Sequence, residues 1–348
     1  MVVIAWWCLG AAWGAPRQLC VFVAADGSVS QVNSIDAVPE PYRGAARCFS
    51  ETMKPERPRD PRLLRPAGPT ETGVRGSGAA LAAPEALELD GPVRRLEMPS
   101  TVGRIELRWP RSVERLFGRS PERAMGEAAR AVSRALKQSS FPPEIQNLNL
   151  EWRVVVMDEA KPDGQIPAEL VSNCHPGWMT PPAQIYVVAQ RVAAGCGGGP
   201  PSDSSIADRE LANVLMHEMG HAVEYQLIGR EFGRSRFRSE GFATWFNGVA
   251  ADYTTLDAPG RTVELHRALA ERALGSGPLL RPFQGSAEDY ARAGMVFRAI
   301  VARRGVRGLL DVYGVMVRDS IDFLPAINTA LGWDDRRVEA EVERIVRR

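Results

Sequence analysis

The chain has 348 residues, enough for one large domain or two smaller ones, and its 45% hydrophobic content is that of an ordinary globular protein. It has 43 lysine and arginine residues against 42 aspartate and glutamate residues. This near-neutral balance, without a basic run, argues against nucleic-acid binding and against electrostatic attachment to a membrane surface.

The first residues are apolar. The run from Val2 to Trp13 is too short to span a bilayer comfortably and has the character of the hydrophobic part of a secretory signal. Small residues precede Ala15, so we expect a signal peptide over 1–14, an exported protein (periplasmic or secreted) and no stable membrane span after cleavage. No lysine or arginine precedes the run, which leaves a short anchor or a misassigned start as the alternative.

The cysteine count agrees with export. Loss of Cys8 with the signal leaves Cys20, Cys48, Cys174 and Cys196, an even number that permits three disulfide pairings. The local pairing, Cys20–Cys48 with Cys174–Cys196, is the simplest. A second metal site is the rival interpretation, and the absence of any C-x-x-C spacing favours disulfides.

Residues 15–50 are expected to form a small N-terminal hairpin unit. A strand at 21–23, a turn at 26–27 and an alternating return through Val29 and Val32 predict the hairpin, and a helical turn leads on to the second cysteine. The unit is too small for a core of its own, so we expect a disulfide to close it.

A proline-rich linker is predicted over 51–100, where prolines and glycines recur among scattered charges. Such a composition buries too little apolar surface to order the chain, and we expect disorder through much of it, with one weak helix at 79–89.

The remaining domain, 101–348, begins with strands and ends with helices. Its first elements are predicted to be a strand at 105–109, a helix from Pro121 to Lys137 capped by Ser120, a strand at 151–157, a polar loop at 158–182 and a strand at 183–190. Later helices are predicted at 262–274, 287–304, 306–318 and after the caps Asp322 and Asp334.

Between these halves, His217, Glu218 and His221 form an H-E-x-x-H motif in a predicted helix with Asp208 as N-cap and Gly229 at its end. Positions i and i+4 lie one turn apart on the same face, so both imidazoles can bind one metal ion. The carboxylate of Glu218 is then placed to take a proton from metal-bound water.

A catalytic zinc needs a third protein ligand and an open fourth position. Glu240 follows His221 after eighteen residues, giving H-E-x-x-H-x18-E, and it opens an apolar run at 242–249 that reads as a second helix. A turn between Leu227 and Arg238 would bring this helix back across the first. We therefore expect Zn²⁺ held by His217, His221 and Glu240; the alternative, a surface helix with an accidental motif, is rare in a chain of 4 histidines.

These residues resemble the gluzincin branch of the zincin metallopeptidases, in which a glutamate on the next helix is the third ligand. The run 239–243 (Ser-Glu-Gly-Phe-Ala) is similar to the Asn-Glu-Gly-Phe-Ala of the M1 aminopeptidase-like group, and the run 289–294 resembles that group's catalytic-tyrosine segment. The resemblance covers 205–315 and implies a bacterial-type exported zinc metallopeptidase in which Tyr290 hydrogen-bonds the oxyanion. No G-x-M-x-N sequence, the aminopeptidase element that recognises a free amino terminus, precedes the zinc helix. Exopeptidase specificity is therefore not implied.

The resemblance also implies the fold class: an α+β, zincin-like catalytic domain with a small mixed sheet, the zinc helix and then a mainly helical C-terminal half. By the same resemblance the last strand before the zinc helix, 183–190, is expected to be the sheet edge that pairs with an extended peptide or protein substrate. The sequence carries no signal for an oligomeric state.

The predicted function is hydrolysis of peptide bonds through a zinc-activated water, with Glu218 as general base and Tyr290 as oxyanion donor. Two alternatives stay open: a catalytically silent zinc-binding interaction or assembly module, and a zinc hydrolase of a non-peptide amide or ester. Retention of Glu218 argues against the silent module, because a purely structural zinc site needs ligands and no base.

Several further residues have two interpretations each. Glu224 either orients a metal ligand or is a solvated surface glutamate, and the surface interpretation is preferred. His175 lines the site or is incidental, with the incidental interpretation preferred, and His266 is taken as a surface residue. Gly220 lets another backbone approach the helix or is an ordinary packing glycine, and Tyr290 is either catalytic or packed at a helix start.

Overall fold

The computed structural model describes residues 18–23, 29–32, 40, 43, 47–50, 93–118, 120–159, 175–195, 203–275, 278 and 280–347. The chain divides into two units, one of Leu9–Ser77 and one that contains Gly78–Arg348. The predicted signal peptide, most of the predicted linker with its weak helix, and both Cys174 and Cys196 lie outside the described residues and stay predictions.

The first unit contains a three-stranded antiparallel sheet in the order β2-β1-β3, from β1 (Gln18–Val23), β2 (Val29–Val32) and β3 (Arg47–Ser50). The β1–β2 pair confirms the predicted hairpin. The helical turn expected before Cys48 lies mostly outside the described residues and stays a prediction, while Arg47 and Cys48 belong to β3, which pairs with β1. In that register Cys20 lies directly opposite Cys48, the backbone placement that a cross-strand disulfide requires, while the bond itself stays a prediction.

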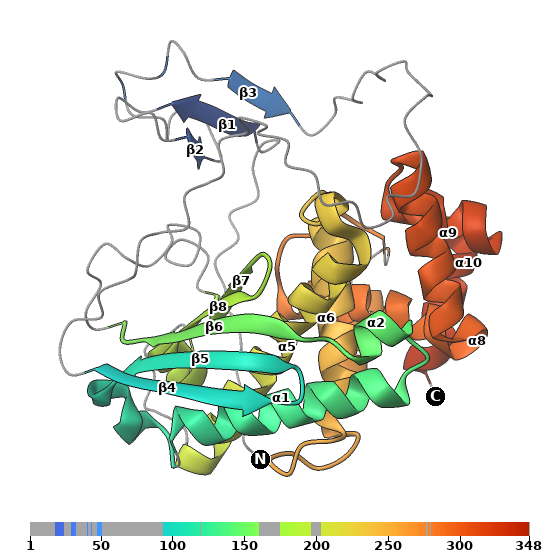
Figure 1. Cartoon of the computed structure of the whole chain (residues 1–348). Coiled ribbons are helices and arrows are strands. Elements are labelled where there is room, and N and C mark those ends of the chain that lie inside the picture. Colours follow the sequence, from blue (N-terminus) through green and yellow to red (C-terminus); the bar gives the residue numbers. More distant parts are fainter. Residues whose placement is uncertain are drawn as a thin grey trace, which may run out of the picture. The chain divides into compact units, whose positions relative to one another are not determined.

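The second unit contains a five-stranded mixed sheet in the order β4-β5-β6-β8-β7 (Figure 1). The inner strands run parallel, and the two end strands run antiparallel to their neighbours. The strands are β4 (Val93–Ser100), β5 (Gly103–Pro110), β6 (Leu150–Met157), β7 (Gly177–Thr180) and β8 (Gln184–Val188).

Two sequence expectations about this sheet need correction. Strand β4 occupies 93–100, inside the stretch assigned to the linker, so the sheet begins before the predicted domain start at 101. Strand β8 was expected to be the sheet edge, but it lies between β6 and β7, and β7 ends the sheet among the described strands. The four residues of β7 are too short a run to be distinguished from the polar loop that contains them.

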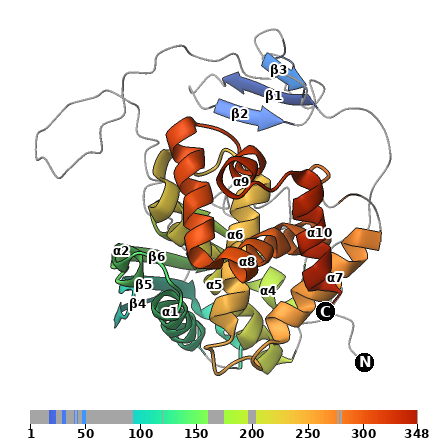
Figure 2. The same ribbon diagram turned by 90° about the vertical axis from the view of Figure 1, so that its right-hand side faces the viewer.

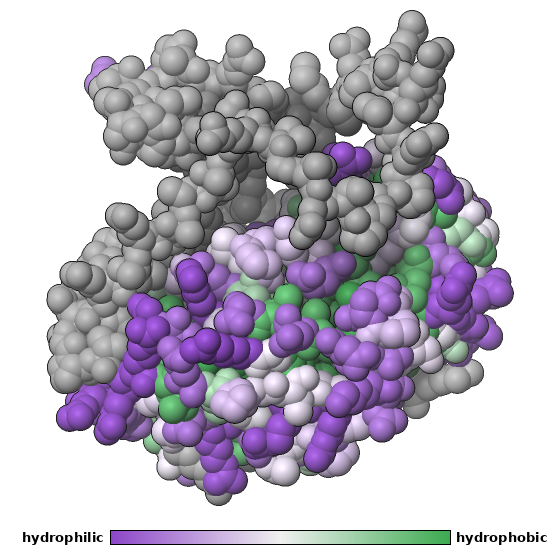
Figure 3. All heavy atoms as spheres, viewed as in Figure 1, coloured by the Kyte–Doolittle hydropathy of each residue, from purple (hydrophilic) through white to green (hydrophobic). Residues whose placement is uncertain are grey.

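One face of the sheet forms the main core. Ile105 and Leu107 of β5 and Val154 of β6 are fully buried against α1 (Pro121–Gln138) and α5 (Ser204–Ile228). Helix α1 is amphipathic: Glu127 is its one buried charged residue, and it exposes Glu122, Arg123, Arg130, Arg134 and Lys137. Figure 3 shows charged and polar side chains over the lower part of this view, where α1 and β4 lie in Figure 1.

The helices after the sheet agree with the predicted helical half. They are α6 (Arg236–Ala251), α7 (Arg261–Gly275), α8 (Ala287–Asp319), α9 (Phe323–Leu331) and α10 (Asp335–Val346). Helix α8 is interrupted at Gly305, which confirms two helical segments there, and Asp322 and Asp334 lie at the predicted N-cap positions. Figure 2 shows the layers in succession, from the sheet through α5 and α6 to α8 and α10.

The sequence missed the short elements and misplaced two helix starts. The missed elements are η3 (Arg111–Leu116), α2 (Pro143–Gln146), α4 (Ala189–Ala194) and η4 (Gly229–Glu231). Asp203, whose side chain accepts from the backbone N–H of Ser205, caps α5, and the predicted cap Asp208 is buried inside the helix. Helix α6 starts at Arg236, earlier than the predicted turn allowed, because Ser235 caps it.

None of the helices in the described part of the chain combines the length and the apolar character that a membrane span needs.

Candidate metal centre

Two adjacent helices bring the predicted ligands together. His217 and His221 lie one turn apart on α5, and Glu240 lies on α6. The helices pack closely because Gly220 has no side chain: a Cβ there would lie 3.1 Å from the Cα of Ala243. The structure therefore supports the interpretation of Gly220 as the point where another backbone approaches α5.

The ligand atoms have the spacing of a metal site. Oε2 of Glu240 lies 3.2 Å from Nε2 of His217 and 3.3 Å from Nε2 of His221. Two ligands each about 2.05 Å from a tetrahedral zinc ion would lie about 3.3 Å apart. Among the described residues this is the one group of three metal-ligating side chains whose ligand atoms all lie within 4.8 Å of one another.

The charges of Glu240 and His221 agree with a metal-binding role. Burial alone would raise the pKa of Glu240, but the imidazoles of His221 and His217 outweigh it and hold the pKa well below its usual range. Burial disfavours the charged form of His221, yet the adjacent Glu240 carboxylate raises the pKa of His221 to about 9. Without a metal ion these groups form an imidazolium–carboxylate pair, and a bound cation would replace the proton.

Ser239 is a residue whose role the sequence did not reveal. Its Oγ lies 3.0 Å from Nδ1 of His221, the ring nitrogen that does not face Glu240. A hydrogen bond from Nδ1–H to this oxygen holds the imidazole with Nε2 directed at the ligand cluster, which is the usual support of a metal-bound histidine.

We expect Ser239→Ala to weaken zinc binding by about 10- to 100-fold, because the ring of His221 loses the group that orients it. Competition with a chromophoric chelator measures the affinity. Ser139→Ala, at the end of α1, is the matched control and should bind zinc like the native chain. An unchanged affinity in Ser239→Ala would show that this hydrogen bond does not support the site.

Glu218 lies beside the ligands and is only 6% exposed. Its carboxylate packs against the first residue of β7, where a Cβ on Gly177 would come within 2.9 Å of Oε1 of Glu218. Burial raises the pKa of this carboxyl group. Strand β7 thus passes directly against the predicted general base.

Tyr290 comes to the same place from α8. The N-cap Ser286 and Asp289 form a capping box that defines the start of this helix, and Tyr290 follows immediately. Its ring centroid lies 6.0 Å from that of His217. Burial and the charge of Glu240 raise the pKa of Tyr290 well above its usual range, so the phenol stays protonated.

Two further side chains join this group. His175, which the sequence left as an incidental loop histidine, is buried, and its Nε2 lies 2.8 Å from Nη2 of Arg236. The same guanidinium nitrogen lies 3.4 Å from the hydroxyl of Tyr290, and Nε of Arg236 lies 3.7 Å from Glu240. Arg236 precedes Glu240 by four residues on α6, so the sequence spacing could have indicated that these two side chains are neighbours.

The surface interpretations of two other residues are wrong. Glu224 is fully buried and accepts hydrogen bonds from Arg238 (2.9 Å) and Tyr313 (2.7 Å), so it ties α5 to α6 and α8. His266 is half-buried, and burial together with the charge of Arg298 lowers its pKa to about 3. Periodicity on one helix cannot show that a second helix covers such a residue.

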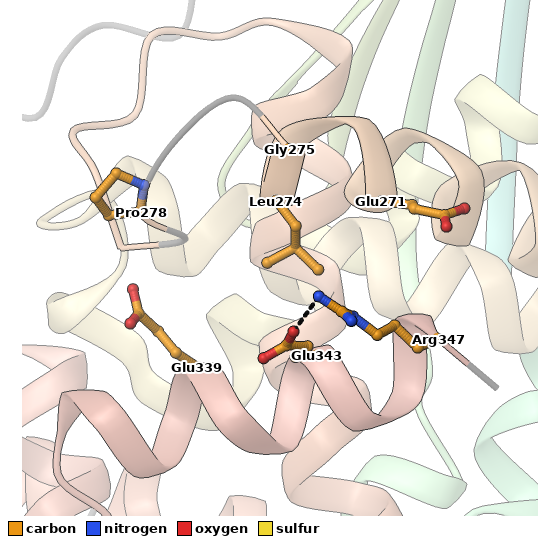
Figure 4. A pocket seen from close by; sticks show the side chains of 7 residues that line it. All are labelled: Glu271, Leu274, Gly275, Pro278, Glu339, Glu343 and Arg347. Atoms are coloured by element: carbon orange, nitrogen blue, oxygen red, sulfur yellow. Dashed lines mark ion pairs between the residues drawn. The ribbon is translucent and has the colours of Figure 1, made fainter.

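A separate pocket of about 430 Å³ lies between α7 and α10 (Figure 4). Its lining includes the ion-paired Glu343 and Arg347 of α10 and Glu271 of α7. None of the sequence-predicted site residues contributes to it.

No protein-family model matches the sequence, and no curated protein matches it. Among solved structures the chain is similar to the M1 zinc metallopeptidase of Deinococcus radiodurans, at 16% sequence identity, with TM-scores of 0.41 for a variant and 0.39 for the other crystal structure. Each match covers 74% of this chain and 52% of that enzyme, so the chain spans about half the length of the structures it matches. The function is therefore inferred from the chain's own side chains.

Proposed function

We propose that the chain is a zinc-dependent metallopeptidase. The observation that carries the proposal is the meeting of His217, His221 and Glu240, whose carboxylate oxygen lies 3.2 and 3.3 Å from the two imidazole nitrogens, with Glu218 next to His217 in the chain. Two imidazoles and one carboxylate from three residues are a donor set of catalytic zinc sites, which keep one position open. A zinc ion bound there would polarise a carbonyl group and lower the pKa of water.

The chain's own residues supply the proton transfers and the hydrogen bonding. Glu218, whose pKa is raised by burial, acts as general base. It takes a proton from the attacking water and passes that proton to the leaving amine. Tyr290 stays protonated beside the cluster and donates a hydrogen bond to the developing oxyanion.

The substrate class in this proposal is an extended peptide segment. Strand β7 ends the sheet among the described strands and starts at Gly177, against the carboxylate of Glu218. A peptide that pairs with β7 through its main chain would lie beside the general base. Main-chain pairing makes few demands on side chains, so the proposal includes broad sequence tolerance.

Zinc content and cleavage together test the proposal. We expect the purified full chain to hold about one zinc ion per molecule, as a three-ligand site predicts, and to cleave peptides in a mixed library read by mass spectrometry. A strong chelator should stop cleavage, added Zn²⁺ should restore it, and His217→Ala should lose the metal. A chain that binds no zinc contradicts the proposal.

The same experiment separates the two alternatives. Zinc binding with no cleavage of peptides, amides or esters would favour a silent interaction module. Hydrolysis of ester or non-peptide amide probes with an intact peptide library would favour the other hydrolase. Glu218 beside the metal ligands supports catalysis over the silent module, because a structural site has no need of a buried base.

Export is a further proposal, supported by the apolar run at 2–13 and by the even number of cysteines after residue 14. Amino-terminal sequencing of the mature protein tests it, with cleavage expected before Ala15.

A further inference from the structure

Three side chains meet next to the candidate metal ligands, and two of them, Arg236 and His175, have no role in the function proposed above. Arg236 comes from the first turn of α6, His175 precedes β7, and the third is the Tyr290 hydroxyl of α8. Arg236 is further held by Glu240 at 3.7 Å and by the ring of Phe283, whose centroid is 5.4 Å from the guanidinium carbon. These contacts place one guanidinium between a metal ligand and the oxyanion donor.

The direction of the hydrogen bonds follows from the chemistry of the groups. A guanidinium can only donate, so Nε2 of His175, 2.8 Å from Nη2 of Arg236, must be the acceptor. A neutral imidazole that accepts at Nε2 carries its proton on Nδ1, and Nδ1 is the atom that lies 3.4 Å from the Tyr290 oxygen. Burial and the charge of Arg236 lower the pKa of His175 to about 4, which agrees with a neutral ring.

The Tyr290 oxygen thus faces two donors, Nδ1–H of His175 and Nη2–H of Arg236, each at 3.4 Å. Both use the lone pairs of the phenol oxygen, so its own hydrogen is directed away from them. The ring centroid of Tyr290 lies 6.0 Å from that of His217, so this phenol lies beside the candidate metal ligands.

We propose that Arg236 is a positioning residue that acts through His175 and Tyr290: it selects the Nδ1–H tautomer of His175 and thereby orients the Tyr290 hydroxyl to donate to the oxyanion of the reacting carbonyl. The proposal rests on the hydrolase function proposed above. It differs from a simpler role in which Arg236 only steadies the metal ligand Glu240, four residues along the same helix.

A double-mutant cycle on the zinc-saturated full chain separates these two roles. With a peptide identified from the library, Tyr290→Phe should lower kcat by about 100- to 1000-fold, as loss of one oxyanion donor does. Arg236→Met should lower kcat by about threefold to tenfold, the value of one or two hydrogen bonds, with KM unchanged. In the Tyr290→Phe background Arg236→Met should have no further effect.

Two more variants are measured beside the double-mutant cycle. Arg236→Lys keeps the positive charge but lacks the planar guanidinium with its several N–H donors. Its kcat should therefore be little higher than that of Arg236→Met. Arg307→Met, at an exposed position of α8, is the control and should match the native chain. Equal losses of kcat from Arg236→Met in both backgrounds, or a loss of zinc affinity that accounts for the whole effect, would overturn the proposal.

The histidine tautomer gives a readout that does not depend on activity. The chain has 4 histidines, so long-range ¹H–¹⁵N spectra of a ¹⁵N-labelled sample are sparse, and His175→Gln assigns the signal. We expect a protonated Nδ1 and an unprotonated Nε2 in the native chain, and an increased Nε2–H population in Arg236→Met. An active native chain with His175 in the Nε2–H form would overturn the positioning role alone, whereas a native chain that hydrolyses nothing would overturn the hydrolase function with it.

Discussion

Glu218→Gln is expected to retain zinc and to lower the rate of hydrolysis by about 100- to 10,000-fold, the usual contribution of a general base. The two side chains have nearly the same shape, so the amide fits the narrow space that Gly177 leaves over Oε1. It cannot accept a proton, and the reaction loses both the activation of the attacking water and the protonation of the leaving amine.

Metal content and rate must be measured on the same preparation. His217→Ala should lose zinc and activity together, whereas Glu218→Gln should lose activity alone. Glu264→Gln, on an exposed face of α7, is the matched substitution outside the site and should behave like the native chain. A Glu218→Gln variant that keeps its rate within tenfold of native would rule out Glu218 as the base and point to another hydrolytic mechanism.

The second large effect concerns stability. Arg238→Met is expected to lower the free energy of unfolding by about 3–5 kcal/mol, because it leaves the Glu224 carboxylate buried without its cation. Both side chains are almost completely inaccessible to solvent, with exposed fractions of 2% and 0%. The hydroxyl of Tyr313 would be the one remaining hydrogen-bond donor on this carboxylate among the described contacts.

Denaturant unfolding of the metal-free chain, followed by far-ultraviolet circular dichroism, measures this effect without the stabilisation that bound zinc would add. Replacing both partners, Glu224→Leu with Arg238→Met, should recover most of the loss, because no unpaired charge then stays buried. The exposed Arg307→Met should change stability by less than about 0.5 kcal/mol. A loss below about 1 kcal/mol in Arg238→Met would show that Glu224 is neutralised in another way.

The ion pair between Glu224 and Arg238 also lies near the candidate metal centre in the sequence of both helices. Glu224 lies on α5 beyond His221, and Arg238 lies on α6 two residues before Glu240. The pair therefore joins the two helices close to the candidate metal ligands. We interpret it as part of what holds Glu240 at ligand distance from the two imidazoles.

The local features of the site could be predicted from the amino-acid sequence alone. The spacing of His217 and His221 places them on one face of a helix whatever surrounds it, because the helical period is a property of the backbone. The start of the last helix could be predicted in the same way, because the Asp334 side chain caps it by accepting from the backbone N–H of Arg337, within a single turn. The adjacent Glu218 needed no tertiary information either.

Which distant residues meet at the site depends on how separate helices and strands pack. His175 lies 61 residues before Arg236 and 115 before Tyr290, and no periodic pattern connects positions so far apart. The buried state of Glu224 and the place of β7 at the end of the sheet likewise depend on how separate elements pack. Hydrogen-bond geometry along one helix is repeated at every turn, whereas contacts between elements are set by the packing of the whole core, which is why the first could be predicted and the second could not.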